Sequence, residues 1–257
     1  MALRNRGNFL RWSDTASETL WNRYTDEQDC LVGTPIMIPG ETYTFYVNTR
    51  DRVTLPSGTN YLKTQAGSSV ATNPISVTNI ALNSPIGGNH SYGTITCPAV
   101  ADGLYYFQVG TWISNIIEVC SSPERTLLIT FSNKSALANV FYEYAPNGFQ
   151  QKFRIRGYVK ERQPFFKGSE REESVTGLTR NYNQHLRGFR IVIFENLNDE
   201  AHEAAAVMFA HSNLEINGHS VQPKIDGAYK PLLNEWEPYS DGEFQVWDDE
   251  FGILNVC

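Results

Sequence analysis

The pattern of apolar and polar positions predicts a mainly β chain. Residues 101–120 carry the strongest signal, because two short runs of alternating apolar residues are separated by a turn-forming glycine. A second alternating segment follows Gln151, with Phe153 and Ile155 facing one way and Arg154 the other. Side chains in a strand point to opposite faces in turn, so this segment predicts a strand with one apolar and one basic face.

Residues 186–223 predict a strand, a helix and a strand in succession. Phe189, Ile191 and Ile193 stand at every second position, which predicts a strand buried mainly on one face. Asn198 or Asp199 then provides a helix N-cap, and the helix is expected over about 199–212. Small or apolar residues recur along it at helical spacing: Ala201, Ala204, Ala205 and Met208. We therefore expect this helix to pack closely on a sheet.

Two aromatic residues near position 110 bear on the first half of the chain. The sequence from Asp102 to Phe107 matches the tyrosine corner of immunoglobulin-like sandwiches, with Tyr105 as the corner residue. Trp112 could serve as a stacking platform for a sugar, but a core position is the more common use of such a tryptophan. These features predict an Ig-like β-sandwich.

A boundary between two domains is predicted at residues 121–124, where small and turn-forming residues separate two strand patterns. The first domain, residues 1–122, comprises an N-terminal arm and the Ig-like sandwich; the arm lies on its own body or on a neighbour, or plugs the base of the sandwich. The second, residues 123–257, is a further β-sandwich-like domain with one α-helix packed on its sheet. Residues 165–185 are predicted to be a long polar loop, either functional or folded by a partner, or else a disordered hairpin at the surface.

The distribution of charge suggests contacts and excludes some partners. The net charge of −7 over 257 residues argues against a dedicated nucleic-acid-binding protein. Ten basic and four acidic residues lie between Lys152 and Arg190, whereas Glu235 to Glu250 contains seven acids and no Lys or Arg. These regions could complement each other within one subunit or between subunits. We find no signal-peptide pattern and no apolar run of membrane-spanning length, and we expect the protein to be made and, at least at first, kept in the cytoplasm.

The search for catalytic and metal-binding patterns predicts neither a cofactor nor an enzyme. His202-Glu203 begins like the zinc-protease pattern HExxH, but Ala206 stands where the second histidine belongs. The cluster Asp248-Asp249-Glu250 lacks the alternating ligands of a calcium loop. The four cysteines show no CxxC spacing, so free thiols are expected. No phosphate-binding glycine loop or nucleophile elbow is present in the sequence.

Residues 113–215 resemble the tail-region structural proteins of tailed bacteriophages. The resemblance rests on the stretch SNIIEVC, a short turn, RTLLITFSNKS, GFQQKFRIRGYVKERQPFFKGSEREE, and the later strand and helix. It implies a non-enzymatic virion component built as a ring at the neck, tail or baseplate, with itself and other virion proteins as partners. A specific nucleic acid or a membrane is not expected as a partner, although the genome could pass through the ring.

The charge pattern suggests how such a ring would form. We hypothesise that the basic strand of one subunit meets the acidic segment of its neighbour, a contact that can close into a ring. The candidate interface residues are Lys152, Arg154, Arg156, Lys160, Arg162, Glu235, Glu237, Asp241, Asp248, Asp249 and Glu250. An alternative of another class is a β-sandwich module that binds carbohydrate or a host surface through Trp112, Tyr61 or the loops of residues 61–93.

Overall fold

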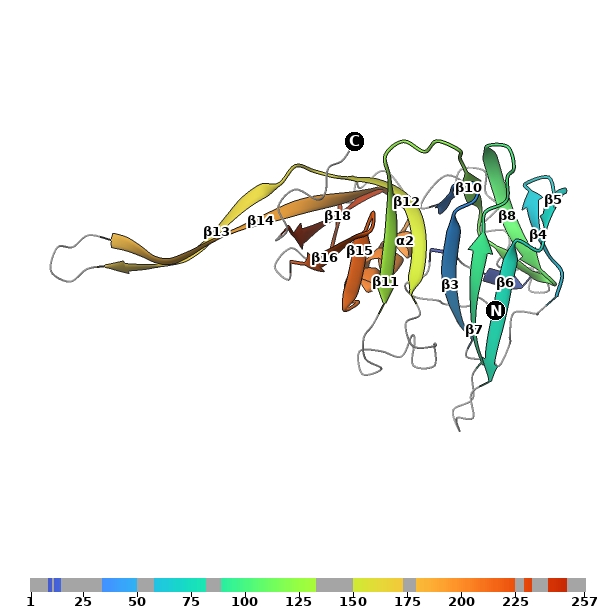
Figure 1. Ribbon diagram of the computed structural model, residues 1–257, viewed down its shortest axis with the longest axis horizontal. Helices are drawn as coiled ribbons and strands as arrows, with labels where there is room; N and C mark the ends of the chain where they lie inside the picture. Colours follow the sequence, from blue (N-terminus) through green and yellow to red (C-terminus); the bar gives the residue numbers. More distant parts are fainter. Residues whose placement is uncertain are drawn as a thin grey trace.

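The computed structural model describes residues 9, 10, 12–14, 34–49, 58–81, 89–132, 150–172, 179–224, 229–232 and 240–248. These residues form strands and one helix, which confirms the predicted mainly β class with a single helix. Figure 1 shows a broad β body from which one long two-stranded arm extends. None of the helical structure described is long and apolar enough to span a membrane.

The smaller sheet is formed entirely by the first half of the chain. It has seven strands, in the order β1-β9-β8-β10-β2, with β4 attached to β8 and β5 attached to β4. Tyr105 and Phe107 of β8 point into the core as the alternating pattern predicts. The Tyr105 hydroxyl donates a hydrogen bond to the Ala101 carbonyl at 2.7 Å, so the predicted tyrosine corner forms. The strands are Trp12–Asp14 (β1), Ile36–Met37 (β2), Asn60–Thr64 (β4), Ser69–Thr72 (β5), Gly103–Val109 (β8), Trp112–Ser114 (β9) and Ile117–Val119 (β10).

The larger sheet has eleven strands and includes both halves of the chain. Its path is β13-β14-β18-β16-β15-β11-β12-β3-β7-β6, with β17 attached to β18. From the first half come Thr42–Thr49 (β3), Ile75–Ala81 (β6) and Asn89–Thr96 (β7). From the second half come Thr126–Ser132 (β11), Gln151–Val159 (β12), Gln163–Glu172 (β13), Thr179–Leu197 (β14), Asn213–Ile216 (β15), His219–Pro223 (β16), Lys230–Leu232 (β17) and Ser240–Trp247 (β18).

An additional pairing closes part of this sheet into a barrel. Gly157 to Val159 of β12 pair with Phe194 to Val192 of β14, so the strands β14, β18, β16, β15, β11 and β12 form a closed circuit. The other end of β12 pairs with β3 through Lys152 and Thr44. Strand β12 therefore belongs both to the barrel and to the sheet β3-β7-β6.

Glycine is required where β12 and β14 close the barrel. A Cβ atom on Gly157 would lie 2.3 Å from the carbonyl oxygen of Ile193, which is closer than any side-chain carbon can approach backbone. The missing side chain therefore lets the two strands meet, as glycine commonly does where backbones approach closely.

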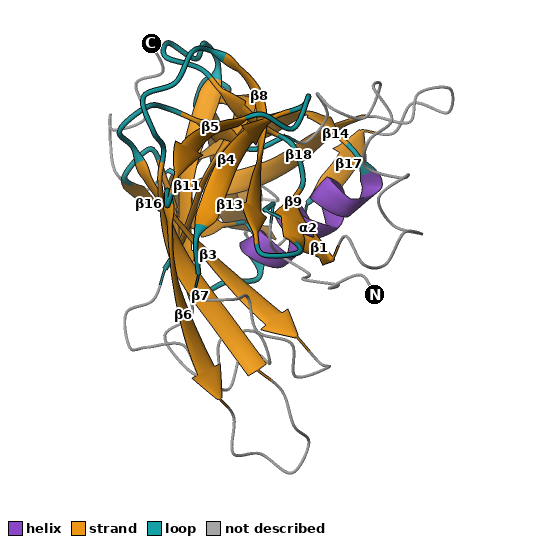
Figure 2. Ribbon diagram, turned by 90° about the vertical axis from the view of Figure 1, so that its right-hand side faces the viewer, coloured by secondary structure: helices purple, strands orange, loops and turns teal. Residues whose placement is uncertain are grey.

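The helix α2 (Asp199–Phe209) packs against the barrel core. Its N-terminus is capped as predicted, because the Asn198 side chain accepts a hydrogen bond from the Ala201 backbone N–H at 2.9 Å. The predicted stripe of small and apolar residues, Ala201 to Met208, is buried. The Phe209 ring packs on Phe244. Figure 2 shows the helix beside the strands of the body.

One continuous hydrophobic core links the two halves of the chain. It contains Phe45 and Phe107 from the first half and Phe131 and Phe194 from the second. Trp112 is also in this core and only 6% exposed, so it is not placed to stack on a sugar. The boundary predicted at residues 121–124 thus falls between elements that share a core and a hydrogen-bonded sheet.

Two predictions about the second half were wrong. Strand β14 is buried on both faces, because Val192 and Phe194 enter the main core while Phe189, Ile191 and Ile193 form a second cluster. The segment 165–185, expected as a polar loop, is strand in its described part, where β13 pairs with β14. The polar sequence of this segment has no apolar alternation, and such a pattern is typical of a loop.

Candidate assembly site

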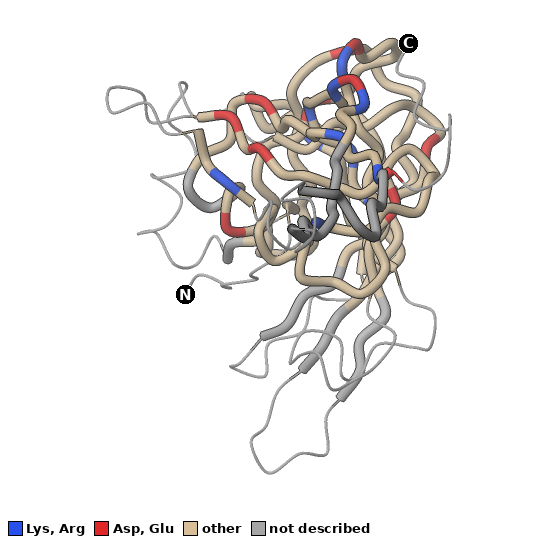
Figure 3. Tube along the Cα trace, turned by 90° about the vertical axis from the view of Figure 1, so that its left-hand side faces the viewer, with Lys and Arg blue, Asp and Glu red and all other residues tan. Residues whose placement is uncertain are grey.

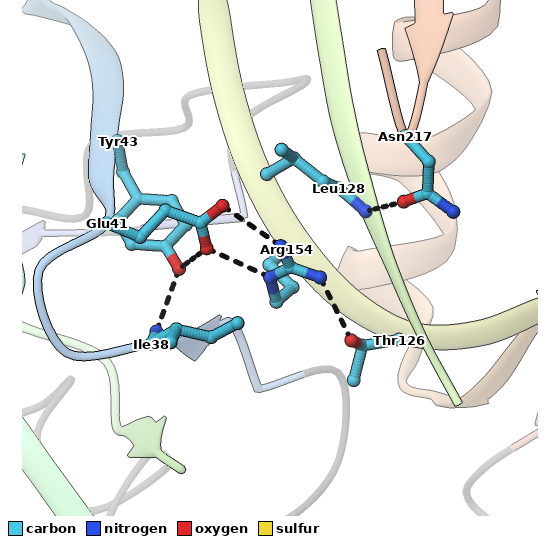
Figure 4. Close-up of polar contacts among 7 residues, drawn as sticks. All are labelled: Ile38, Glu41, Tyr43, Thr126, Leu128, Arg154 and Asn217. Carbon is cyan, nitrogen blue, oxygen red and sulfur yellow. Dashed lines mark hydrogen bonds and ion pairs between the residues drawn. The ribbon is translucent and has the colours of Figure 1, made fainter. Parts of the chain in front are cut away.

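The predicted basic face of β12 forms, but its two central arginines bind acids of the same chain. Arg154 donates from Nε and Nη2 to the two carboxylate oxygens of Glu41, at 3.0 and 2.9 Å. Its Nη1 donates to Thr126 on β11 at 3.1 Å. Glu41 precedes β3, so this bidentate pair joins the barrel to the first half of the chain (Figure 4).

The surroundings of Glu41 keep its carboxylate charged. Burial alone would favour the neutral acid, but hydrogen bonds from Arg154 and from the Tyr43 hydroxyl outweigh it and lower the pKa of Glu41. Burial raises the pKa of Tyr43, and the hydrogen bond that its hydroxyl donates to Glu41 raises it further, so the hydroxyl stays protonated. The Tyr43 oxygen also accepts from the Ile38 N–H at 2.9 Å. Glu41, Tyr43 and Arg154 thus form one hydrogen-bonded network with a structural role, which we call the clamp.

Arg156 makes a second link of the same kind. Its Nη2 lies 2.6 and 2.8 Å from the carboxylate oxygens of Glu118, on β10 of the smaller sheet. The Arg156 side chain is 43% exposed, so this pair is more solvated than the Arg154 clamp. Together the two arginines connect β12 to the loop before β3 of the larger sheet and to β10 of the smaller sheet.

The end of the basic segment meets the acidic segment within one subunit. Lys160 lies 4.0 Å from Glu243, and Arg162 lies 3.7 Å from Asp248. Arg190 donates to the same Asp248 oxygen at 2.8 Å. Asp248 is 5% exposed and held by two guanidinium groups, an arrangement unlike a calcium site. The predicted charge complementarity is thus met inside the chain, and Figure 3 shows basic and acidic positions interspersed along the described trace.

The remaining candidate interface residues are divided between described and undescribed segments. Lys152 pairs through its backbone with Thr44 of β3. Asp241 accepts a hydrogen bond from the Asn196 backbone N–H at 3.0 Å. The other four lie outside the described residues: Glu235, Glu237, Asp249 and Glu250. Among the described candidates, Arg154, Arg156, Lys160, Arg162 and Asp248 all have ionic partners within the subunit.

The feature that sequence reasoning missed is the arm, defined here as β13 together with residues 179–187 of β14. Within the described chain, β13 pairs only with β14, and β14 joins β18 only from Phe189 onward. At about 3.3 Å per residue the arm is roughly 30 Å long. A register shift between Lys167 and Ser169 bends it. Figure 1 shows it extending away from the body.

The root of the arm is anchored on the outside of the barrel. Phe189, Ile191 and Ile193 of β14 pack with Tyr158 of β12 and Trp247 of β18. Basic side chains cover this cluster. The Arg187 guanidinium lies 4.1 Å from the Trp247 ring centre, and the Lys224 ammonium lies 4.5 Å from that of Phe189. The anchored root fixes the direction of the arm.

The helix contains the only described histidine arrangement that resembles catalytic chemistry. His202 contacts the Tyr229 hydroxyl through Nδ1 and the Ser240 hydroxyl through Nε2, the latter at 2.8 Å. A serine and a histidine at this distance can act as nucleophile and base, but the orienting partner here is a phenol, and burial raises its pKa and keeps it neutral. His211 instead contacts the Val207 and Met208 carbonyls. We interpret the His202 contacts as holding α2 against β17 and β18.

The described residues contain no group of three or more His, Cys, Asp or Glu side chains arranged to hold a metal ion. Comparison with protein-family models, curated proteins and solved structures gives no match to the chain.

Proposed function

We propose that this chain is a non-enzymatic structural subunit of a bacteriophage virion, which assembles with copies of itself into a ring at the neck, tail or baseplate. The virion assignment rests on the resemblance of residues 113–215 to tail-region proteins. The arm is the single observation that best supports assembly. The ring is expected to contact other virion proteins on its faces.

The arm favours assembly because a two-stranded ribbon is only marginally stable in water without a third strand or a packed face. Here β13 has one strand neighbour, and the pairing of β14 with β18 ends at Phe189. A ribbon about 30 Å long that is rigidly anchored at its root is suited to reach another subunit.

The ion pairs of β12 indicate that the contact between subunits is not made by this basic strand. Arg154 and Arg156 are bound to Glu41 and Glu118 of their own chain. Charge reversal at these arginines would therefore act first on the fold of the subunit. Between Lys152 and Arg190, the part that is directed away from the body is the arm and not the strand β12 (Figure 1).

The test compares the full chain with a variant whose arm is shortened. Lys167 and His185 are directly paired in the ribbon, so residues 168–184 can be replaced by Asn-Gly, which forms a two-residue hairpin turn. Sedimentation velocity and negative-stain imaging should show uniform rings for the full chain and a folded monomer for the variant. Val70→Ser is a matched control, since this exposed side chain lies on β5 of the other sheet.

Two results would contradict the proposal. One is a full chain that stays monomeric at high concentration, both alone and co-expressed with the other virion proteins. The other is a shortened variant that forms the same rings.

A further inference from the structure

The larger sheet ends in two different strands. At one end β13 pairs only with β14, and at the other end β6 pairs only with β7, among the residues the structure describes. An edge strand presents backbone N–H and C=O groups that can pair with another chain, and proteins commonly protect such edges. Within the described chain, each of these two edges is protected over one part of its strand and unprotected over the rest.

The edge of β6 is paired at its start and, among the described residues, has no neighbouring strand beyond it. The Asn60 side-chain amide donates to the Ile75 carbonyl at 2.9 Å and accepts from the Ile75 N–H at 2.9 Å. The polar backbone groups of Ile75 therefore point away from β7 and are already paired. Because direction alternates along an antiparallel strand, those of Val77, Asn79 and Ala81 point the same way. Figure 2 shows β3, β7 and β6 running beyond the rest of the body.

The edge of β13 is likewise closed beside the body and, in the part of the chain that the structure describes, unprotected further along the strand. The Gly188 carbonyl accepts from the Asp248 N–H at 2.9 Å, so the backbone groups of Gly188 point away from β13. Its partner Pro164 then faces outward from the ribbon, where proline has no N–H to offer. The edge is closed there, beside the body. Further along the arm, from Phe166 toward Glu172, the chain contains no other proline.

The two open edges lie at opposite ends of the molecule. In Figure 1 the arm extends from one end of the long axis and β6 lies near the other. A contact between different surfaces of identical subunits repeats from each subunit to the next, and it closes into a ring when the rotation between neighbours allows. The arm runs across the view and β6 runs steeply to it, so two paired subunits would be turned relative to each other.

We propose that the occupant of the β6 edge is the β13 strand of a second copy of this chain, which extends the neighbour's sheet by one strand. This inference rests on the proposed assembly and specifies its contact. Each chain contributes one open edge of each kind, so a closed ring leaves neither edge exposed. Main-chain hydrogen bonds supply the affinity in this mode of recognition.

A proline at Val77 tests the contact directly. Val77→Pro removes an N–H that points outward and leaves the ladder between β6 and β7 complete. Val77→Ala is the matched control, because it shortens the same half-buried side chain and keeps the N–H. We expect Val77→Pro to be a folded monomer by circular dichroism and sedimentation, and Val77→Ala to form rings.

Mixing two blocked chains provides the decisive measurement. The arm-shortened variant retains an open β6 edge, and the Val77→Pro variant retains its arm. A mixture should give a one-to-one heterodimer by mass measurement, whereas either variant alone remains monomeric. The β6 edge is excluded as the docking site if Val77→Pro forms rings while the arm-shortened chain is monomeric, a result that leaves the proposed function intact. Rings formed by both variants would overturn the proposed function as well.

Discussion

At the scale of single residues, the clamp of Glu41 and Arg154 gives a prediction about pH. Glu41→Gln should lower the free energy of unfolding by about 1–3 kcal/mol at neutral pH, because a charge-assisted bidentate bond is lost in a mostly buried position. The folded-state pKa of Glu41 lies below its ordinary value of 4.5. The stabilisation is therefore complete above that value and is lost as pH falls through the lowered pKa. Urea unfolding from about pH 7 to pH 3 would measure this.

Glu118→Gln is the control for that experiment. Its partner Arg156 is 43% exposed, so we expect a loss of no more than about 1 kcal/mol. An equal loss in both variants, or a difference that does not change with pH, would contradict the structural role assigned to the clamp.

A second residue-scale prediction concerns Gly157. Gly157→Ala should reduce the free energy of unfolding by about 1–3 kcal/mol, since the added carbon meets the Ile193 carbonyl oxygen and the strands closing the barrel must separate. Gly58→Ala introduces the same carbon where no heavy atom lies within 4 Å. Denaturant titration should show little change for Gly58→Ala, and equal losses would argue against a tight seam between β12 and β14.

At the scale of elements, the cap of α2 can be tested alone. Asn198→Ala should cost about 1 kcal/mol of unfolding free energy, because the Ala201 N–H loses its acceptor. Asn198→Asp retains an acceptor oxygen at the positive end of the helix and should be nearly neutral. Thermal unfolding of the two variants would separate the effect of the hydrogen bond from that of the side-chain volume.

The elements that the sequence predicts correctly are those with a single packing face. Strands β8 and β12 alternate cleanly because one face meets the core, and α2 is marked by its cap and its buried stripe. The sequence of the arm shows no apolar alternation, so its pattern resembles that of a loop. Strand β14 carries apolar residues on both faces because its outer face anchors the arm, and a rule based on one buried face misreads it.

The candidate interface shows a different limit of sequence reasoning. The charges of β12 and of the acidic segment are complementary, as predicted, but charge composition does not distinguish contacts within a chain from contacts between chains. Glu41 lies 113 residues before Arg154, and Glu118 lies 38 residues before Arg156. Arg154 meets Glu41 because β12 pairs with β3, and Arg156 meets Glu118 because β12 lies near β10.

At the scale of the whole molecule, the proposed contact predicts how assembly depends on salt. Backbone hydrogen bonds between edge strands are not screened by ions, whereas exposed charge pairs are weakened at high ionic strength. The ring should therefore keep its sedimentation coefficient from about 50 mM to 1 M sodium chloride. Dissociation over this range would instead favour the ionic contact between the basic strand and the acidic segment of a neighbour.

The shared strand β12 has a mechanical consequence. The ladders from β13 through β14 and β12 to β3, β7 and β6 are continuous, so tension applied to the arm is carried across the whole subunit to the opposite edge. A pull along the arm loads the ladders of β14 in shear, where many hydrogen bonds share the force, instead of peeling them apart one at a time. The narrowest junction on this path is between β12 and β3, which pair only at Lys152 and Thr44, so the ion pair of Arg154 with Glu41 beside it would share the load there.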